Sequence, residues 1–156
     1  MNKLDISVLL VDDDKVLQMV YEKQISKLVN QVFIADNGLD GFEKYQEFHP
    51  DLVITDIKMP LMNGLDMTSR IKKNDSKARI ILLSAYGEAA YFLRAIDIGV
   101  KLFLLKPVDN KKLIQSIEEQ AYEILLEKKI AEEEKLRKKA EENLFRNEQI
   151  LQAVSE

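Results

Sequence analysis

Cysteine is absent from the 156 residues of this sequence. Its absence excludes disulfide bonds, thiolate nucleophiles and zinc sites built from thiolates. Long apolar runs are absent as well, since none approaches the roughly 20 residues that a membrane-spanning helix needs. The first residues, Met1 to Asp5, lack the apolar stretch of a signal peptide. We therefore expect a cytoplasmic chain without a membrane partner.

Glycine and proline are scarce, and the charge is nearly balanced. The five glycines and three prolines all lie between Gly38 and Pro107. The net charge of -4 offers no general attraction for nucleic acids or anionic membranes, so we expect no nucleic-acid partner. We expect one domain at residues 1–122 and a helical segment, rich in helix formers and charges, at residues 123–156.

Short apolar runs alternate with helix-like stretches through the first part. Such runs are typical of buried strands in a parallel sheet, and we expect strands at residues 6–11, 32–35, 52–55, 80–83 and 102–105. We expect five helices, at residues 14–28, from 38 to before Pro50, from 65 through 71, at 88–98, and from 109 or 110 onward. The alternation predicts an α/β fold: a doubly wound, three-layer sandwich with a five-stranded parallel sheet. In the first helix, the residues expected on the inner face are Val16, Leu17, Val20, Ile25 and Leu28.

The second part shows a repeat of alternating three- and four-residue steps that is typical of coiled coils. Its positions are Leu126, Ile130, Glu133, Arg137, Ala140, Leu144, Asn147, Leu151 and Val154. Six of these positions are apolar, and the middle of the repeat is polar. A solvated single helix or a frayed end is the alternative, but the high helix propensity favours a coiled-coil linker or dimerisation segment.

Polar residues that could handle a phosphoryl group follow the strands. Asp12-Asp13-Asp14 follow the first strand, Asp56 ends the third, Ser84 follows the fourth, and Lys106-Pro107 follow the fifth. The carboxyl ends of parallel strands form the ligand-binding edge of an open α/β sheet. The sequence therefore predicts that carboxylates, a hydroxyl and an ammonium converge at one edge.

Each of these residues also has an ordinary structural explanation. One of the three consecutive aspartates is enough to cap a helix, and the others would repel one another unless a cation lies between them. Taken with Asp56 and Lys106, they favour a magnesium site over capping alone. Asp56 alone could be a turn residue, but beside a metal ion and a lysine it could be a nucleophile that forms an aspartyl phosphate. Ser84 alone is a common turn residue.

At this point the chain resembles the receiver domain of bacterial two-component response regulators, and in particular the chemotaxis type. The matching motifs are residues 10–13, 51–60, 62–64, 83–85 and 99–107. The resemblance covers about residues 5–122 and implies a sheet with strand order 2-1-3-4-5, while the helical tail lies outside it.

The resemblance implies a role for each site residue. Asp56 resembles the phosphoacceptor, and Asp12 and Asp13 resemble the acidic pair that holds Mg2+, with Asp56 and the backbone carbonyl of Lys58 as further ligands. Lys106 resembles the family lysine that pairs with the phosphate. Ser84 and Phe103 resemble the switch pair of the family, although Phe103 alone would be an ordinary flanking aromatic. Lys58 and Tyr86 occupy family positions that tune hydrolysis.

The resemblance thus implies a phosphorelay signalling protein that catalyses only its own phosphorylation and dephosphorylation. The expected partners are a histidine kinase or phosphotransfer protein and a second copy of the chain, joined through the last helices and tail. The expected output is a downstream effector domain, missing here, and the alternative is a stand-alone dimeric receiver. Two rivals are weaker: a docking module with vestigial acids, and a Mg2+-dependent phosphatase. The phosphatase would need an acid two residues after Asp56, where Lys58 stands.

Overall fold

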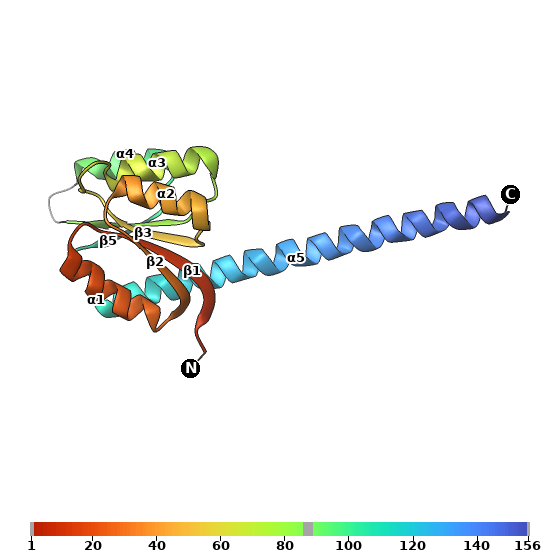
Figure 1. Ribbon diagram of the computed structural model, residues 1–156, viewed down its shortest axis with the longest axis horizontal. Coiled ribbons are helices and arrows are strands. Elements are labelled where there is room, and N and C mark those ends of the chain that lie inside the picture. Colours follow the sequence, from red (N-terminus) through yellow and green to blue (C-terminus); the bar gives the residue numbers. More distant parts are fainter. Residues whose placement is uncertain (1, 86–88, 156) are drawn as a thin grey trace. The chain divides into compact units, whose positions relative to one another are not determined.

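The structure is a computed structural model that describes residues 2–85 and 89–155. Its strands are β1 (Leu4–Val11), β2 (Val29–Ala35), β3 (Leu52–Asp56), β4 (Ile80–Ser84) and β5 (Leu102–Leu105). Its helices are α1 (Lys15–Ser26), α2 (Gly38–Phe48), α3 (Gly64–Asn74), α4 (Ala90–Ile98) and α5 (Asn110–Ser155). Strands and helices alternate along the chain, as the sequence predicts (Figure 1).

All strand pairs are parallel, and the sheet has the order β2-β1-β3-β4-β5. Helix α1 and the beginning of α5 cover one face of this sheet, while α2, α3 and α4 cover the other (Figure 1). The predicted doubly wound, three-layer α/β sandwich is therefore confirmed. Burial on both faces explains why the central strands read as continuous apolar runs rather than alternating ones.

The largest part of the core lies between the sheet and helices α2 to α4. Leu9, Val53 and Leu82 come from three neighbouring strands and are fully buried. Leu65 and Ile71 of α3 are fully buried in the same cluster. Removing each such side chain from water contributes about 1.5–3 kcal/mol, so this layer holds the central strands and their carboxyl ends in a fixed arrangement.

Most predicted boundaries of the strands and helices are close to the observed ones, but the inner face of α1 is not the predicted one. The buried residues of α1 are Gln18, Tyr21 and Ile25, whereas Val16 and Val20 are exposed. The prediction that Val16 and Val20 face inward was wrong, because the helix instead turns a glutamine toward backbone carbonyls at the edge of the sheet. The predicted start of the fourth helix at Glu88 and the position of Tyr86 lie outside the described residues.

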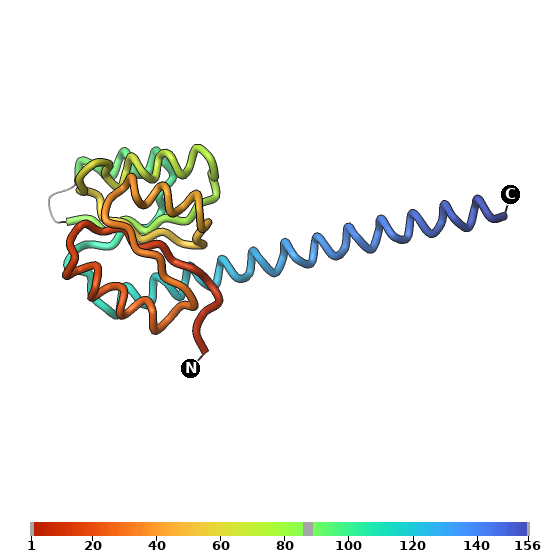
Figure 2. The backbone as a smooth tube through the Cα atoms, in the orientation of Figure 1, coloured from red at the N-terminus to blue at the C-terminus, as the bar shows by residue number. Residues whose placement is uncertain are grey.

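Helix α5 runs without a break in the backbone trace (Figure 2). Judged by its internal contacts, the chain divides into two compact units, Met1–Ala121 and Tyr122–Glu156, and the division falls inside α5. In the second unit the described side chains of the predicted repeat are all exposed. Among the described residues, no helix combines the length and the apolar character that crossing a membrane would require.

Candidate functional site

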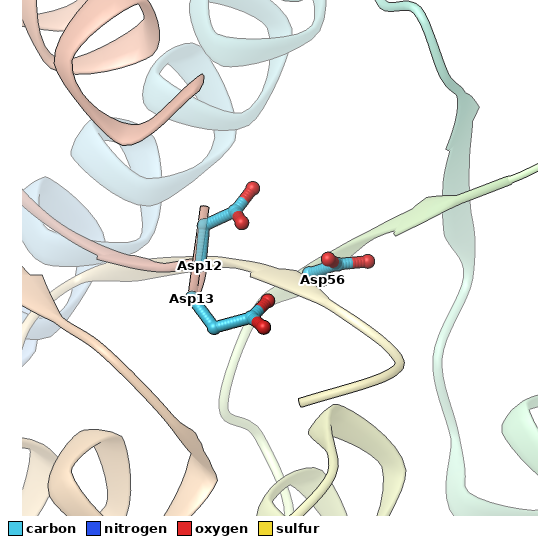
Figure 3. Close-up of side chains that lie close together, drawn as sticks. All are labelled: Asp12, Asp13 and Asp56. Carbon is cyan, nitrogen blue, oxygen red and sulfur yellow. The ribbon is translucent and has the colours of Figure 1, made fainter. Parts of the chain in front are cut away.

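Three carboxylates meet at the carboxyl end of the central strands. In the register of β1 and β3, Val11 pairs with Thr55, so the residues that follow, Asp12 and Asp56, lie side by side. Asp13 follows directly, and one carboxylate oxygen from each of the three acids lies within 4.8 Å of the others. Figure 3 shows the three side chains grouped at this edge of the sheet.

Asp14, the third of the consecutive aspartates, has a different task. Its carboxylate accepts hydrogen bonds from the backbone N–H groups of Val16 (3.0 Å) and Leu17 (3.2 Å), and it is the N-cap of α1. A helix begins with unpaired N–H groups, and a single aspartate satisfies two of them here. Capping therefore uses one of the three aspartates, Asp14, and leaves Asp12 and Asp13 to the acidic cluster.

Asp12 is the most deeply buried of the acids, with no exposed surface. Its Oδ1 accepts a hydrogen bond from the backbone N–H of Asp14 at 2.9 Å, and its Oδ2 lies 3.3 Å from Lys106 Nζ. Burial raises the pKa of Asp12 above its ordinary value, and the nearby Asp56 charge adds to that rise. The Asp14 amide and Lys106 oppose the rise without cancelling it. Additional positive charge at this position would therefore stabilise the ionised form.

Asp56 lies at the end of β3 with both carboxylate oxygens engaged. Oδ1 accepts a hydrogen bond from the backbone N–H of Ile57 at 2.8 Å, and Oδ2 lies 2.9 Å from Lys106 Nζ. The Thr55 hydroxyl donates to the backbone carbonyl of Asp56 at 2.8 Å, which holds the strand end itself. Since 14% of its side chain remains exposed, Asp56 is oriented by the protein and still accessible to a reactant.

Lys106, which follows β5, forms ion pairs with both Asp12 and Asp56. Burial alone would lower the pKa of its ammonium, but the hydrogen bond and charge of Asp56, together with Asp12, outweigh burial and raise this pKa. Its backbone N–H donates to the Ser84 carbonyl at 2.7 Å, which anchors Lys106 to the end of β4. The Lys106–Pro107 peptide bond is cis. Lys106 is therefore a fixed, charged partner of the carboxylates.

The donor set fits a divalent cation. Three carboxylates and one ammonium leave two uncompensated negative charges in a small volume. Carboxylate oxygens are hard ligands, and Mg2+ binds through a few of them while keeping several waters. The predicted further ligand, the backbone carbonyl of Lys58, stays a prediction. The Lys58 ammonium lies 6.0 Å from the centroid of the Tyr91 ring.

The two predicted switch residues lie on neighbouring strands. Ser84 is 2% exposed at the end of β4 and pairs with Leu105 of β5, one residue before Lys106. Phe103 of β5 is half-buried, and its ring meets that of Phe92 on α4 edge-to-face at 5.0 Å between centroids. Ser84 therefore lies at the strand edge that carries the acids, and the role of this pair as a switch stays a prediction.

Two residues support the site in ways that sequence reasoning did not predict: Gln18 was missed altogether, and Gly64 was noted only as part of the motif at residues 62–64. Gln18 of α1 donates from Nε2 to the backbone carbonyl of Asp12 at 2.9 Å and to that of Ala35 at 3.3 Å, so it holds the chain just after β1. The signal for Gln18 was its spacing, one helical turn after Asp14. Gly64, the first residue of α3, packs directly on β3, since an added Cβ would lie 2.0 Å from the backbone oxygen of Asp56.

The fold and the acidic cluster together define the class of response regulator receiver domains. The sequence profile of that family, described as the response regulator receiver domain, matches residues 8–118, and the chain belongs to the family. Like other receiver domains, it is a signalling module of a two-component system.

Individual relatives agree with this assignment. The chain is similar to the chemotaxis protein CheY of Thermotoga maritima, with 40% identity over 111 residues that cover 70% of this chain and 92% of the relative. Among solved structures, it resembles the N-terminal domain of an uncharacterized protein from Wolinella succinogenes, with a TM-score of 0.75, 35% identity and coverage of 78% and 98%. It also resembles a DNA-binding response regulator of the LuxR family from Staphylococcus aureus, with a TM-score of 0.69, 26% identity and coverage of 74% and 98%.

Proposed function

We propose that this receiver domain accepts a phosphoryl group on Asp56 from the phosphohistidine of a kinase or phosphotransfer protein. The observation that carries the proposal is the position of Asp56, whose carboxylate contacts Lys106 at 2.9 Å and shares its edge of the sheet with Asp12 and Asp13. A carboxylate attacks a phosphoryl group only when the negative charge of both is neutralised and their geometry is held. Lys106 supplies part of the neutralisation, a Mg2+ ion held by the three acids would supply the rest, and the hydrogen bond from the Ile57 N–H holds the geometry of Asp56.

Each residue has a defined task in the transfer. A carboxylate oxygen of Asp56 forms a bond to phosphorus, the bond from phosphorus to the donor imidazole breaks, and the imidazole leaves with the electron pair. Asp12, Asp13, Asp56 and the carbonyl of Lys58 would hold Mg2+, which supplies charge neutralisation to the phosphoryl oxygens. The Ile57 N–H holds one oxygen of Asp56, and Lys106 provides the counter-charge that the phosphorylated residue would keep.

The proposed consequence of phosphorylation is a shift between two conformations. The Ser84 hydroxyl would donate to a phosphate oxygen, and the Phe103 ring would move into the space that this leaves. The Phe103 ring contacts Phe92 of α4, and β5 leads along the chain into α5, so the change would reach a downstream domain or a second copy through that helix. In this proposal residues 1–122 are the receiver and residues 123–156 are a linker or dimerisation segment.

Phosphorylation can be tested with acetyl phosphate, a small donor that replaces the kinase. We expect the wild-type protein to gain one phosphoryl group in the presence of Mg2+ and to gain none in excess EDTA, as measured by intact-mass spectrometry. Asp56→Ala should gain none under either condition. Asp97→Ala, which removes an exposed carboxylate of α4, is the matched control and should be labelled normally. Retained labelling of Asp56→Ala would refute the assignment.

A further inference from the structure

The second unit presents a row of exposed apolar side chains along α5. The exposed fractions are 46% for Leu126, 57% for Ile130, 61% for Leu144, 69% for Leu151 and 79% for Val154. Their successive spacings of 4, 14, 7 and 3 residues all fit a seven-residue repeat, and these residues therefore lie along one side of the helix. A second helix laid against this side would remove several large apolar groups from water, which favours association.

The row follows a heptad pattern, written abcdefg. Position a is occupied by Ile130, Arg137, Leu144 and Leu151, and position d by Leu126, Glu133, Ala140, Asn147 and Val154. We call these a and d residues the seam. The polar centre of the seam consists of Glu133 and Arg137, with apolar residues on either side. A polar centre of this kind lowers the stability of a coiled coil and specifies its register.

The positions that flank the seam distinguish the two possible orientations of a helix pair. Within the repeat from Leu126 to Val154, the e positions are all glutamate, namely Glu127, Glu134, Glu141 and Glu148, whereas the g positions contain no acid, namely Lys129, Leu136, Asn143 and Ile150. In a parallel pair each e position faces a g position of the partner, and in an antiparallel pair e faces e. An antiparallel pair would therefore place glutamate against glutamate along one flank.

We propose that residues 126–154 form a parallel, in-register, two-stranded coiled coil with a second copy of this chain. This deepens the dimer part of the proposed function, and it commits to an orientation and a register. In this arrangement Glu134 faces Lys129 of the second copy, an attractive pair that occurs twice by symmetry. No e–g contact in the parallel pair joins two acids.

The polar centre is compatible with this arrangement. Arg137 donates to Glu134 and to Glu141 on its own helix, each at 2.6 Å, so both e glutamates draw its charge toward the flank of the seam. In an in-register pair Arg137 lies opposite Arg137 of the second copy and Glu133 opposite Glu133, and the ion pairs of Arg137 with Glu134 and Glu141 on its own helix offset the repulsion between the two arginines. A slip by one heptad would instead place Arg137 opposite Ile130 or Leu144, where a charge meets only apolar surface.

Cysteine cross-linking of the full chain tests the orientation, because the natural sequence contains no cysteine that could interfere. We expect Val154→Cys, in the seam, to form a disulfide-linked homodimer under mild oxidation, whereas the outward-facing f-position variant Gln149→Cys should not. An antiparallel pair centred on Glu133 and Arg137 would place position 126 opposite position 144. A Leu126→Cys and Leu144→Cys mixture that forms mostly mixed dimers, or a Val154→Cys protein that stays unlinked, would overturn the proposal.

Charge reversal tests the contact between Lys129 and Glu134 independently. Lys129→Glu and Glu134→Lys should each raise the dimer dissociation constant by roughly fivefold, which is the effect expected from losing two exposed ion pairs. The double variant should restore the wild-type constant. The c-position variant Glu132→Lys is the matched control and should leave the constant unchanged. Sedimentation equilibrium of the full chain provides the measurement, and a double variant no tighter than the single ones would contradict the parallel orientation.

Acetyl phosphate labelling of Asp56 separates this proposal from the proposed function. All tail variants should be labelled as the wild type is, since none of them touches the acidic cluster. A protein that is labelled normally and stays monomeric at all concentrations would overturn the coiled coil and leave the phosphoacceptor role intact. A parallel dimer that is never labelled would overturn the phosphoacceptor role and leave the coiled coil intact.

Discussion

Replacing Lys106 by methionine should destabilise the metal-free protein and make it more responsive to Mg2+. The substitution removes the charge but keeps an apolar stem of similar length. At an effective dielectric constant of about 20, the ammonium attracts a charge at 2.9 Å by about 6 kcal/mol and one at 3.3 Å by about 5 kcal/mol. The desolvation of Lys106 and the mutual repulsion of the acids offset part of this, and breaking a buried pair typically costs about 3–5 kcal/mol. Because 15% of the side chain is exposed, we expect a loss near the lower end, about 3 kcal/mol.

Urea unfolding with EDTA and with saturating Mg2+ measures this effect. Saturating Mg2+ should narrow the stability difference between Lys106→Met and the wild type by about half, because its charge replaces that of the ammonium among the same acids. For the same reason the variant should bind Mg2+ about tenfold more tightly than the wild type, a difference of about 1.4 kcal/mol. Lys15→Met is the matched control, because it breaks an exposed pair with Asp36 at 2.5 Å and should cost less than about 1 kcal/mol.

The pH dependence follows from the raised pKa of Lys106. Since its folded-state pKa lies above the ordinary value of 10.5, the stabilisation by Lys106 is complete below 10.5 and is lost as the pH rises through the raised value. The stability difference between wild type and Lys106→Met should therefore be constant near neutrality and shrink in the alkaline range. Equal stability of the two proteins in EDTA, or equal stabilisation of both by Mg2+, would refute the electrostatic reasoning.

Two further predictions concern residues that frame the phosphoacceptor. Burial raises the folded-state pKa of Asp12, so its ionisation costs stability as the pH rises from the ordinary 3.8 through the raised value. Asp12→Asn should remove this pH-dependent loss in urea unfolding with EDTA, and identical pH profiles would contradict it. In Gly64→Ala, the added Cβ would lie 2.0 Å from the Asp56 carbonyl oxygen, so the end of β3 must move. We expect a loss of about 2–4 kcal/mol and slower acetyl phosphate labelling, and a normal labelling rate would show that the shift does not reach the Asp56 carboxylate.

The fold could be predicted because its local signals agree with one another. Strands buried on both faces of a parallel sheet must be apolar throughout, and residues 52–55 and 80–83 stand out for this reason. The location of Asp56 at a strand end followed from the same pattern. The inner face of α1 could not be predicted in this way, because this helix has apolar residues on more than one side. Gln18 faces inward because two backbone carbonyls from other segments accept its hydrogen bonds.

By itself, the amino-acid sequence determined the order of strands and helices, the acids at the strand ends and the heptad period of the tail, because each depends on neighbouring residues. Only the tertiary structure decided how Lys106 meets Asp12 and Asp56. The chain separates Lys106 from Asp12 by 94 residues, and β4 lies between β5 and β3 in the sheet. Lys106 reaches Asp56 across one intervening strand and Asp12 across two, because its side chain is long, the strand ends are fixed by the packed core, and the opposite charges attract in a partly buried setting.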